Sequence, residues 1–327
     1  MIRRALLPVG AFLALALTCH SALAASADAY PTRPIRLVVP YAPGGGSDVM
    51  ARMIGQKIGE SLGQTVVVDN RPGAASMIGT VLVAKALPDG YTLLLADAAF
   101  TINRSYYAKQ AHYDPQADFV PIALIADTPY ILMTHPQVPA ATIKDFIALA
   151  RAQPGKINIG SSGNGSGSHL MVELFKLKAG VNLNHIPYKG AGPSTADVMA
   201  GQIQGAFAGA AGVIALVKSG RLKALVQAAP KRSPNIPDVA TFPEAGFPDL
   251  IVSNWYGIAA PARTPQPVVK RLYDEIGRAV ATADVKERLA AAALEPVPQS
   301  PDRFRQLIDI EVKRWAQVIR DANIQTE

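Results

Sequence analysis

The sequence is poor in cysteine, and this excludes several kinds of site. Its one cysteine, Cys19, lies near the N-terminus of the 327-residue chain. If the N-terminal segment is removed, no thiol remains for a disulfide, a cysteine nucleophile, an iron–sulfur cluster or a zinc–thiolate site. Long apolar runs are missing as well, because no internal stretch reaches the roughly 18 uninterrupted apolar residues that a membrane-spanning helix needs. These absences predict a globular protein that is stabilised by packing alone.

Charge is also scarce and evenly spread. Charged residues make up 17% of the chain and apolar residues 49%, which is an ordinary globular balance, and the length predicts about two domains. Without Arg3 and Arg4, 30 basic residues stand against 25 acidic ones, with no long run of lysine or arginine. We therefore expect no nucleic acid partner, although a mild positive field can steer small anions toward the protein.

The N-terminus has the pattern of a secretory signal peptide. Arg3 and Arg4 precede an apolar run over 5–17, and Ala-Leu-Ala at 22–24 forms a cleavage signal. We expect residues 1–24 to be removed on export to the periplasm. A membrane anchor is disfavoured because the run is too short to span a bilayer. Acylation of Cys19 is disfavoured because no small residue directly precedes it.

The first part of the mature chain alternates strands with helices. Hydrophobic spacing and turn residues predict a strand, a helix, a strand, a helix and a strand in turn, at 35–39, 48–62, 65–68, 76–87 and 91–95. Strands that are joined through helices lie parallel, because each helix returns the chain to the starting edge of the sheet. A parallel βαβαβ unit follows from this order.

A second alternating region begins near residue 119. Strands are expected at 121–125, 131–133, 156–160, 184–187 and 205–207, and helices at 143–151, 166–179 and 195–201. Segment 222–226 leads into a proline-rich stretch over 230–248, which we interpret as a return to the first unit. The C-terminal part is expected to be helical, with Thr264-Pro265 and Ser300-Pro301 as helix starts and Trp315 on the apolar face of the last helix. Two α/β lobes result: lobe 1 comprises residues 25–127 and 251–327, and lobe 2 comprises residues 128–250.

Two glycine-rich loops are the strongest candidates for a binding site. Loop 41–48 follows the first strand, and loop 160–169 occupies the equivalent junction in lobe 2. Ligands of open parallel sheets bind beyond the carboxyl ends of the strands, where unpaired N–H groups at helix starts favour an anion. The alternative is that these glycines only form tight turns. Two such loops at matching positions favour a site.

Several other chemistries lack their motifs. Neither loop fits the phosphate-binding pattern, the dinucleotide pattern fails because Ser168 stands at its last position, and no serine has the G-x-S-x-G context. We therefore expect no catalytic residues and no cofactor. The histidines of the mature chain have no metal-ligand spacing, so we expect no metal site; they are His112, His135, His169 and His185.

Three polar residues near the loops allow two interpretations each. Asp48 is either a helix-start carboxylate that interacts with the dipole or a partner for a ligand amine. His169 is either a structural residue near a helix start or a base. Arg71 is either a carboxylate-binding fork or a solvated surface residue.

The order and spacing of several short segments resemble the Bug family, also called the TctC family, of receptors for tripartite tricarboxylate transporters. The resemblance spans essentially the whole mature chain. It rests on Pro40-Tyr41-Ala42-Pro43-Gly44-Gly45-Gly46-Ser47-Asp48, Asn70-Arg71-Pro72-Gly73-Ala74, Pro88-Asp89-Gly90-Tyr91-Thr92-Leu93, Ser162-Gly163-Asn164-Gly165-Ser166 and His185-Ile186-Pro187-Tyr188-Lys189-Gly190. The chain departs from the family pattern at Tyr41, where phenylalanine is common, and at Ala75 and Ser76, where glycines are usual.

The resemblance implies an α/β fold of the two-lobed periplasmic-binding-protein type II, with a ligand cleft between the lobes. It implies a small carboxylate ligand, which could be a dicarboxylate, a tricarboxylate, an amino acid or an aromatic acid, and membrane permease subunits as partners. The residues that we expect to bind the ligand are Tyr41, Pro43, Gly44, Gly45, Ser47, Asp48, Asn70, Gly73, Ser162, Gly165, Ser166 and Tyr188. Two alternatives stay open: a receptor that signals to a sensor protein, and an exported hydrolase or isomerase that uses Asp48 or His169 as a base.

Overall fold

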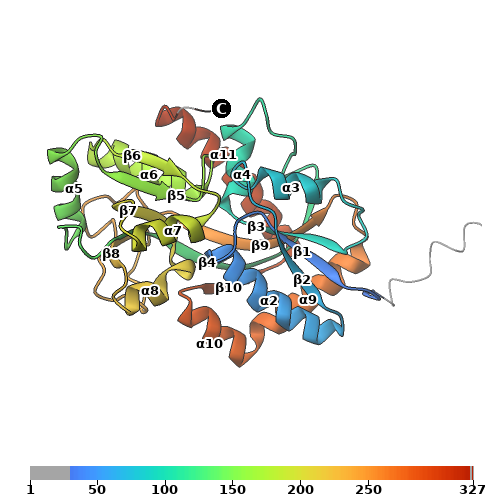
Figure 1. Cartoon of the computed structure of the whole chain (residues 1–327). Helices are drawn as coiled ribbons and strands as arrows, with labels where there is room; N and C mark the ends of the chain where they lie inside the picture. Colours follow the sequence, from blue (N-terminus) through green and yellow to red (C-terminus); the bar gives the residue numbers. More distant parts are fainter. Residues whose placement is uncertain (1–29, 325, 327) are drawn as a thin grey trace, which may run out of the picture.

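The computed structural model describes residues 30–324 and residue 326. The predicted signal peptide at 1–24 lies outside these residues. Figure 1 shows two groups of strands and helices side by side, with long strands running between them. This is the mixed α/β architecture expected from the alternating sequence pattern. None of the described helices combines the length and the apolar character that crossing a bilayer requires.

Lobe 1 begins with the predicted parallel unit. Its elements are β1 (Ile35–Val39), α2 (Gly46–Leu62), β2 (Val66–Asn70), α3 (Met77–Ala84), β3 (Thr92–Ala96) and α4 (Ala98–Tyr106). β1 pairs in parallel with both β2 and β3, which confirms the βαβαβ prediction. Helix α4 was not predicted. Its start is set by Asp97, whose side chain accepts a hydrogen bond from the N–H of Ala99 and so caps the helix.

A single long strand replaces the two strands predicted at 121–125 and 131–133. β4 runs from Phe119 to Thr134 without a break. Asp127, Thr128 and Pro129, which lie between the two predicted strands, pair with β9 (Ser253–Pro261) in antiparallel register. Beyond Pro129, β4 pairs with strands of lobe 2. β4 therefore belongs to the sheets of both lobes.

Lobe 2 repeats the strand–helix alternation. Its elements are α5 (Ile143–Ala152), β5 (Asn158–Ser161), α6 (Gly167–Ala179), β6 (Asn184–Pro187), α7 (Ala191–Met199), β7 (Gly205–Gly209), the 3₁₀ turn η1 (Ala210–Gly212), α8 (Ile214–Lys218) and β8 (Lys223–Gln227). β5 pairs in parallel with β6 and β7. Thr142 and Asp145 form the predicted capping box of α5.

The chain returns to lobe 1 through an irregular segment and ends in helices. The later elements are α9 (Gln266–Ala281), α10 (Ala283–Ala291), β10 (Glu295–Gln299) and α11 (Pro301–Asp321). Ser300 caps α11 as predicted. The predicted cap at Thr264 is wrong: Pro265 is the N-cap of α9, and the hydroxyl of Thr264 donates instead to the carbonyl of Pro261.

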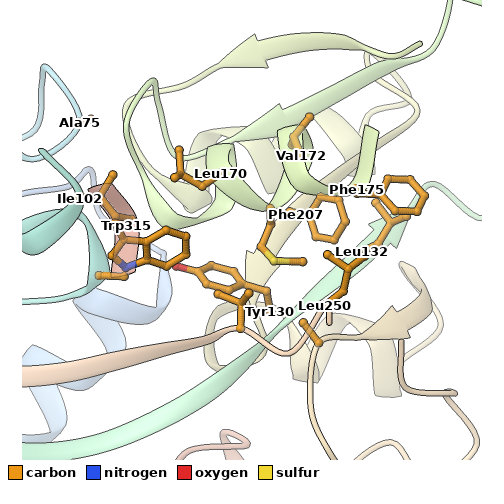
Figure 2. Close-up of a cluster of buried hydrophobic side chains, with 14 of the residues drawn as sticks. Ala75, Ile102, Tyr130, Leu132, Leu170, Val172, Phe175, Phe207, Leu250 and Trp315 are labelled. Carbon is orange, nitrogen blue, oxygen red and sulfur yellow. The ribbon is translucent and has the colours of Figure 1, made fainter. Parts of the chain in front are cut away.

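A hydrophobic cluster continues from lobe 1 into lobe 2. It includes Phe100 of α4, Trp315 of α11, and Phe175 and Phe207 of lobe 2, each no more than 1% exposed. Figure 2 shows part of it, with Trp315 on one side of Tyr130 and Phe207 and Phe175 on the other. The indole N–H of Trp315 donates to Glu311 one turn earlier, so the buried ring leaves no polar atom unpaired. The two lobes therefore meet over a packed core at β4 and α11.

Candidate ligand-binding site

A polar cavity lies where the two lobes meet. Its volume is about 390 Å³. Residues from both lobes line it: Tyr41, Gly45, Gly46, Ser47, Asp97, Tyr130, Ser162, Ser166, Gly167, Ser168, Ala191, Gly209, Asn254 and Tyr256. Both predicted glycine-rich loops contribute to this list. The two loops thus face one common cavity.

Two helices begin at this cavity from opposite lobes. α2 starts at Gly46 and α6 starts at Gly167, and the first residues of both helices line the cavity. The N–H groups in the first turn of an α-helix have no acceptor within their own helix. The helix dipole adds partial positive charge at the same ends. The N–H groups of Gly46, Ser47, Gly167 and Ser168 are therefore suited to bind an anion between the lobes.

Glycine is required at both helix starts because side chains of other elements come very close. A Cβ atom on Gly46 would lie 2.4 Å from the hydroxyl of Tyr256, and one on Gly167 would lie 2.1 Å from the hydroxyl of Tyr130. Neither glycine has a positive φ angle, so the requirement is close approach and not backbone conformation. The phenol groups thereby stand directly beside the open helix ends.

Several of the predicted amide donors already donate within the protein. The N–H of Gly44 donates to Asp48, that of Ser162 to the hydroxyl of Ser168, and that of Gly165 to Nδ1 of His169. The N–H of Ser166 donates to the carbonyl of Gly163. Ser162 and Ser166 nevertheless line the cavity, where the hydroxyl of Ser166 accepts the N–H of His169 and is hydrogen-bonded to the hydroxyl of Ser168.

Asp48 and Asn70 hold loop 41–48 in position. Asp48 is 6% exposed; its carboxylate accepts hydrogen bonds from Gly44, Arg52 and Asn70 and forms an ion pair with Arg52 at 2.9 Å. Burial alone would raise the pKa of Asp48, but the hydrogen bonds from Arg52, Gly44 and Asn70 outweigh it and lower the pKa. Asn70 also donates to the carbonyl of Tyr41. Neither Asp48 nor Asn70 lines the cavity, and both support the loop that does.

Five other residues that were expected to bind the ligand lie outside the cavity and contact other parts of the protein. The carbonyl of Pro43 faces Gly192 of α7, and Gly44 lies against the same glycine. Gly73 packs against Ile78, and Gly165 against Asn103 and two tyrosines of lobe 1. The hydroxyl of Tyr188 donates to Asp197 at 2.6 Å, and burial, followed by this hydrogen bond, raises the pKa of Tyr188 to about 12. None of the five lines the cavity, so ligand contact by them remains a prediction.

The fold brings together two histidines that are distant in sequence. His169 and His185 stack with ring centroids 4.3 Å apart. One ring nitrogen of each histidine lies within 4.8 Å of a carboxylate oxygen of Glu173, so the three groups are close enough to be considered as a metal site. Sequence spacing did not indicate this cluster. Nδ1 of His169 accepts the N–H of Gly165, so Nε2 carries the proton, and Lys176 already binds both oxygens of Glu173. These contacts disfavour a cation, and burial lowers the histidine pKa values to about 4 and about 3.

Nine lining residues were not among those expected to bind the ligand. Three of them, Gly46, Gly167 and Ser168, belong to the two predicted loops. The other six are Asp97, Tyr130, Ala191, Gly209, Asn254 and Tyr256. Asp97 follows the third parallel strand directly, so the rule that identified the two loops could also have identified it. Tyr130, Asn254 and Tyr256 come from the long strands β4 and β9, where apolar patterning dominates the sequence signal, and Ala191 and Gly209 come from α7 and β7.

Direct contacts join the two lobes around the cavity. The N–H of Ala42 donates to the carbonyl of Lys189 at 3.0 Å, and the hydroxyl of Tyr107 donates to the carbonyl of Asn164 at 3.0 Å. A Cβ atom on Gly212 of lobe 2 would lie 2.8 Å from the nitrogen of Gly46. The lobes are therefore closed on each other at the cavity.

Comparisons with known proteins identify relatives along nearly the whole chain. The sequence model described as "Tripartite tricarboxylate transporter family receptor" matches residues 50–324. The chain is 37% identical to Protein BugT of Bordetella pertussis over 319 aligned residues, and the alignment covers 97% of each sequence.

Solved structures agree with this sequence relationship. The structure is similar to that of the periplasmic binding protein BugD, with a TM-score of 0.89 and 33% identity over 91% of this chain and 100% of that one. It is also similar to Rpa4515 of R. palustris, solved with adipate, with a TM-score of 0.87 and 32% identity over 90% of this chain and 98% of that one.

Proposed function

Because the chain belongs to the receptor family of tripartite tricarboxylate transporters, the Bug/TctC family, we propose that it captures a small carboxylate between its lobes and presents it to a membrane permease. The family consists of solute-binding receptors. Its solved relatives are periplasmic binding proteins, and one of them holds adipate, a dicarboxylate.

One observation carries this proposal: two helix N-termini from opposite lobes open into one cavity that is lined by hydroxyl groups. The lining residues include Ser47, Ser166 and Ser168 but no lysine, arginine or histidine. A carboxylate held by main-chain N–H groups gains charge-assisted hydrogen bonds without a buried ion pair. Such a grip suits a receptor that must release its ligand.

Closure supplies the signal to the permease. We propose that lobe 1 and lobe 2 separate when the site is empty and close over the ligand, hinging where β4 and β9 cross between them. The cross-lobe hydrogen bonds of Ala42 and Tyr107 would form only on closure. A sensor protein could read the same closed state, and capture experiments with the separate candidate partners distinguish it from a permease.

A catalytic role for Asp48 or His169 has little support. Neither residue lines the cavity. Asp48 is held as a partnered carboxylate with a lowered pKa, and His169 accepts a main-chain N–H. We therefore propose a non-enzymatic receptor. We also propose that residues 1–24 are cleaved on export, in which case N-terminal sequencing of the periplasmic protein begins at Ala25.

Calorimetry tests the proposed ligand class. Protein that has been unfolded, stripped of ligand and refolded is titrated with mono-, di- and tricarboxylates and with amino acids. We expect at least one of them to bind with micromolar affinity, about 8 kcal/mol. Failure of the whole series to bind would contradict the proposal.

A further inference from the structure

Asp97 places a buried carboxyl group in the cavity. The residue follows β3, caps α4 and is 7% exposed. Its Oδ1 accepts hydrogen bonds from the hydroxyl of Tyr41 and from the N–H of Ala99, both at 3.1 Å. Among the described residues, Oδ2 has no hydrogen-bond donor. One oxygen is therefore fixed by the protein while the other is available to a ligand in the cavity.

No positive side chain balances this group. The lining contains no lysine, arginine or histidine, and Asp97 is its only carboxyl residue. The titratable groups that face Asp97 from other elements are the phenols of Tyr41, Tyr113, Tyr130 and Tyr256, and burial raises the pKa of each well above its usual value. These phenols therefore stay neutral over the ordinary pH range.

The carboxylate of Glu311, which lies near Tyr130, is paired with neighbouring residues of its own helix. Glu311 of α11 acts on Tyr130, but it forms an ion pair with Arg314 at 3.2 Å and accepts the indole N–H of Trp315. The pKa of Asp97 itself is raised to about 7 by burial, against the hydrogen bonds from Tyr41 and Ala99. Near neutral pH, Asp97 is thus the lining residue that a bound ligand can shift between its protonated and its ionised form.

The cavity consequently offers two unlike ends. The starts of α2 and α6 present N–H donors for an anion, whereas Oδ2 of Asp97 presents an acceptor. A plain dicarboxylate directed at Asp97 would face a like charge with no cation nearby. An ammonium group there would form a charge-assisted hydrogen bond in a buried site.

We propose that Asp97 is a specificity-determining residue that selects carboxylates carrying an ammonium group over the plain acids of the same chain length. This inference rests on the proposed carboxylate-binding function. Because the ammonium group favours the ionised form of Asp97, binding of such a ligand releases a proton and strengthens as the pH rises through about 7. A plain acid that binds Asp97 in its protonated form takes up a proton and weakens over the same range.

Matched ligand pairs test the inference in the intact protein. Calorimetry on refolded, ligand-stripped protein compares 2-aminoadipate with adipate, glutamate with glutarate, and aspartate with succinate, in buffers of different ionisation heat. In at least one pair, we expect the ligand with an ammonium group to bind at least tenfold more tightly than the acid without one. Its binding should release a proton at pH 7. The substitution Asp97→Asn should reduce that preference at least tenfold.

The control is Asp274→Asn, which changes a carboxyl group of α9 that pairs with Lys270 and lies outside the cavity and away from β4 and β9. It should keep the wild-type preference. The wild-type comparison needs no variant, so it stands even if Asp97→Asn fails to fold. Plain acids that bind as tightly as their amino partners, or an amino preference that survives Asp97→Asn, would overturn this inference alone. No binding by any carboxylate would overturn the proposed function as well.

Discussion

The N–H of Ala42 in lobe 1 donates a hydrogen bond to the carbonyl of Lys189 in lobe 2, with 3.0 Å between nitrogen and oxygen. The two residues are far apart in sequence: Ala42 lies within loop 41–48, and Lys189 lies two residues before Ala191, the first residue of α7, which lines the cavity. In the proposed closure mechanism this main-chain bond forms only when the lobes are closed, so it links closure to the geometry of loop 41–48. A substitution that prevents the lobes from closing should therefore weaken ligand binding without altering the fold of either lobe.

Gly212→Ala tests closure directly. The three atoms nearest to the new Cβ all belong to lobe 1, with the nitrogen of Gly46 at 2.8 Å, and Gly212 has no positive φ angle that an alanine would strain. We expect at least tenfold weaker binding, about 1.4 kcal/mol, with thermal stability of the ligand-free protein almost unchanged. The control Gly277→Ala in α9 has no atom near its Cβ and should leave binding as it is. Unchanged affinity in Gly212→Ala would contradict the closure mechanism.

The close contact between Gly167 and Tyr130 predicts a coupled pair of substitutions. Gly167→Ala places a Cβ 2.1 Å from the hydroxyl of Tyr130 and should lower the free energy of unfolding by about 1–3 kcal/mol. Tyr130→Phe removes that oxygen but leaves Asn254 without its donor. The double variant should be more stable than the sum of the two single effects, by about 1 kcal/mol or more. Urea denaturation of the wild type, the two single variants and the double variant measures this coupling. Additive effects would show that residue 167 and the hydroxyl of Tyr130 are not in close contact.

Asp97 should give stability a distinct pH dependence. Burial raises the pKa of its carboxyl group in the folded protein to about 7, compared with about 3.9 in an unfolded chain. The folded state therefore holds the proton more tightly, and this contribution is complete below about pH 4 and lost as the pH rises to about 7. Relative to the wild type, Asp97→Asn should gain stability across that window, on the order of 4 kcal/mol at most. Denaturation curves at several pH values measure the difference, and a difference independent of pH would mean that Asp97 is ionised throughout.

The loop after β2 contains three successive non-glycine residues with positive φ, at Ala74, Ala75 and Ser76. A left-handed conformation of a non-glycine residue costs about 1–3 kcal/mol. Ala75→Gly should therefore leave stability unchanged or raise it by up to about 1 kcal/mol. The same change at an exposed position in the middle of a helix, Ala148→Gly in α5, should lower stability by about 1 kcal/mol. Thermal melting compares the two variants, and equal losses would argue against strain at Ala75.

The order of elements and the two glycine-rich loops that line the cavity could be predicted because they depend on local signals. Apolar spacing gave β1 to β3, and Thr142 with Asp145 marked the start of α5. The division of β4 into two strands was predicted wrongly, because Pro129 and its polar neighbours look like a break in isolation. Pairing with β9, which is distant in sequence, overrides that local signal.

The cavity itself depends on contacts that sequence spacing does not encode. Which N–H groups stay open was not predictable, because Gly165 donates to a histidine side chain and Ser162 to a serine hydroxyl four or more positions away. Tyr130 and Tyr256 reach the cavity only because β4 and β9 pass between the lobes. Asp97 follows a predicted strand, but its burial beside Tyr41 emerges only from packing.

The account is tested most directly by a crystal structure of the protein with the carboxylate that binds most tightly in the calorimetric series. We expect the carboxylate oxygens to lie about 3 Å from N–H groups at the starts of both α2 and α6, with the lobes closed. A carboxylate that contacts only one lobe, or that pairs with a lysine or arginine side chain elsewhere, would contradict it.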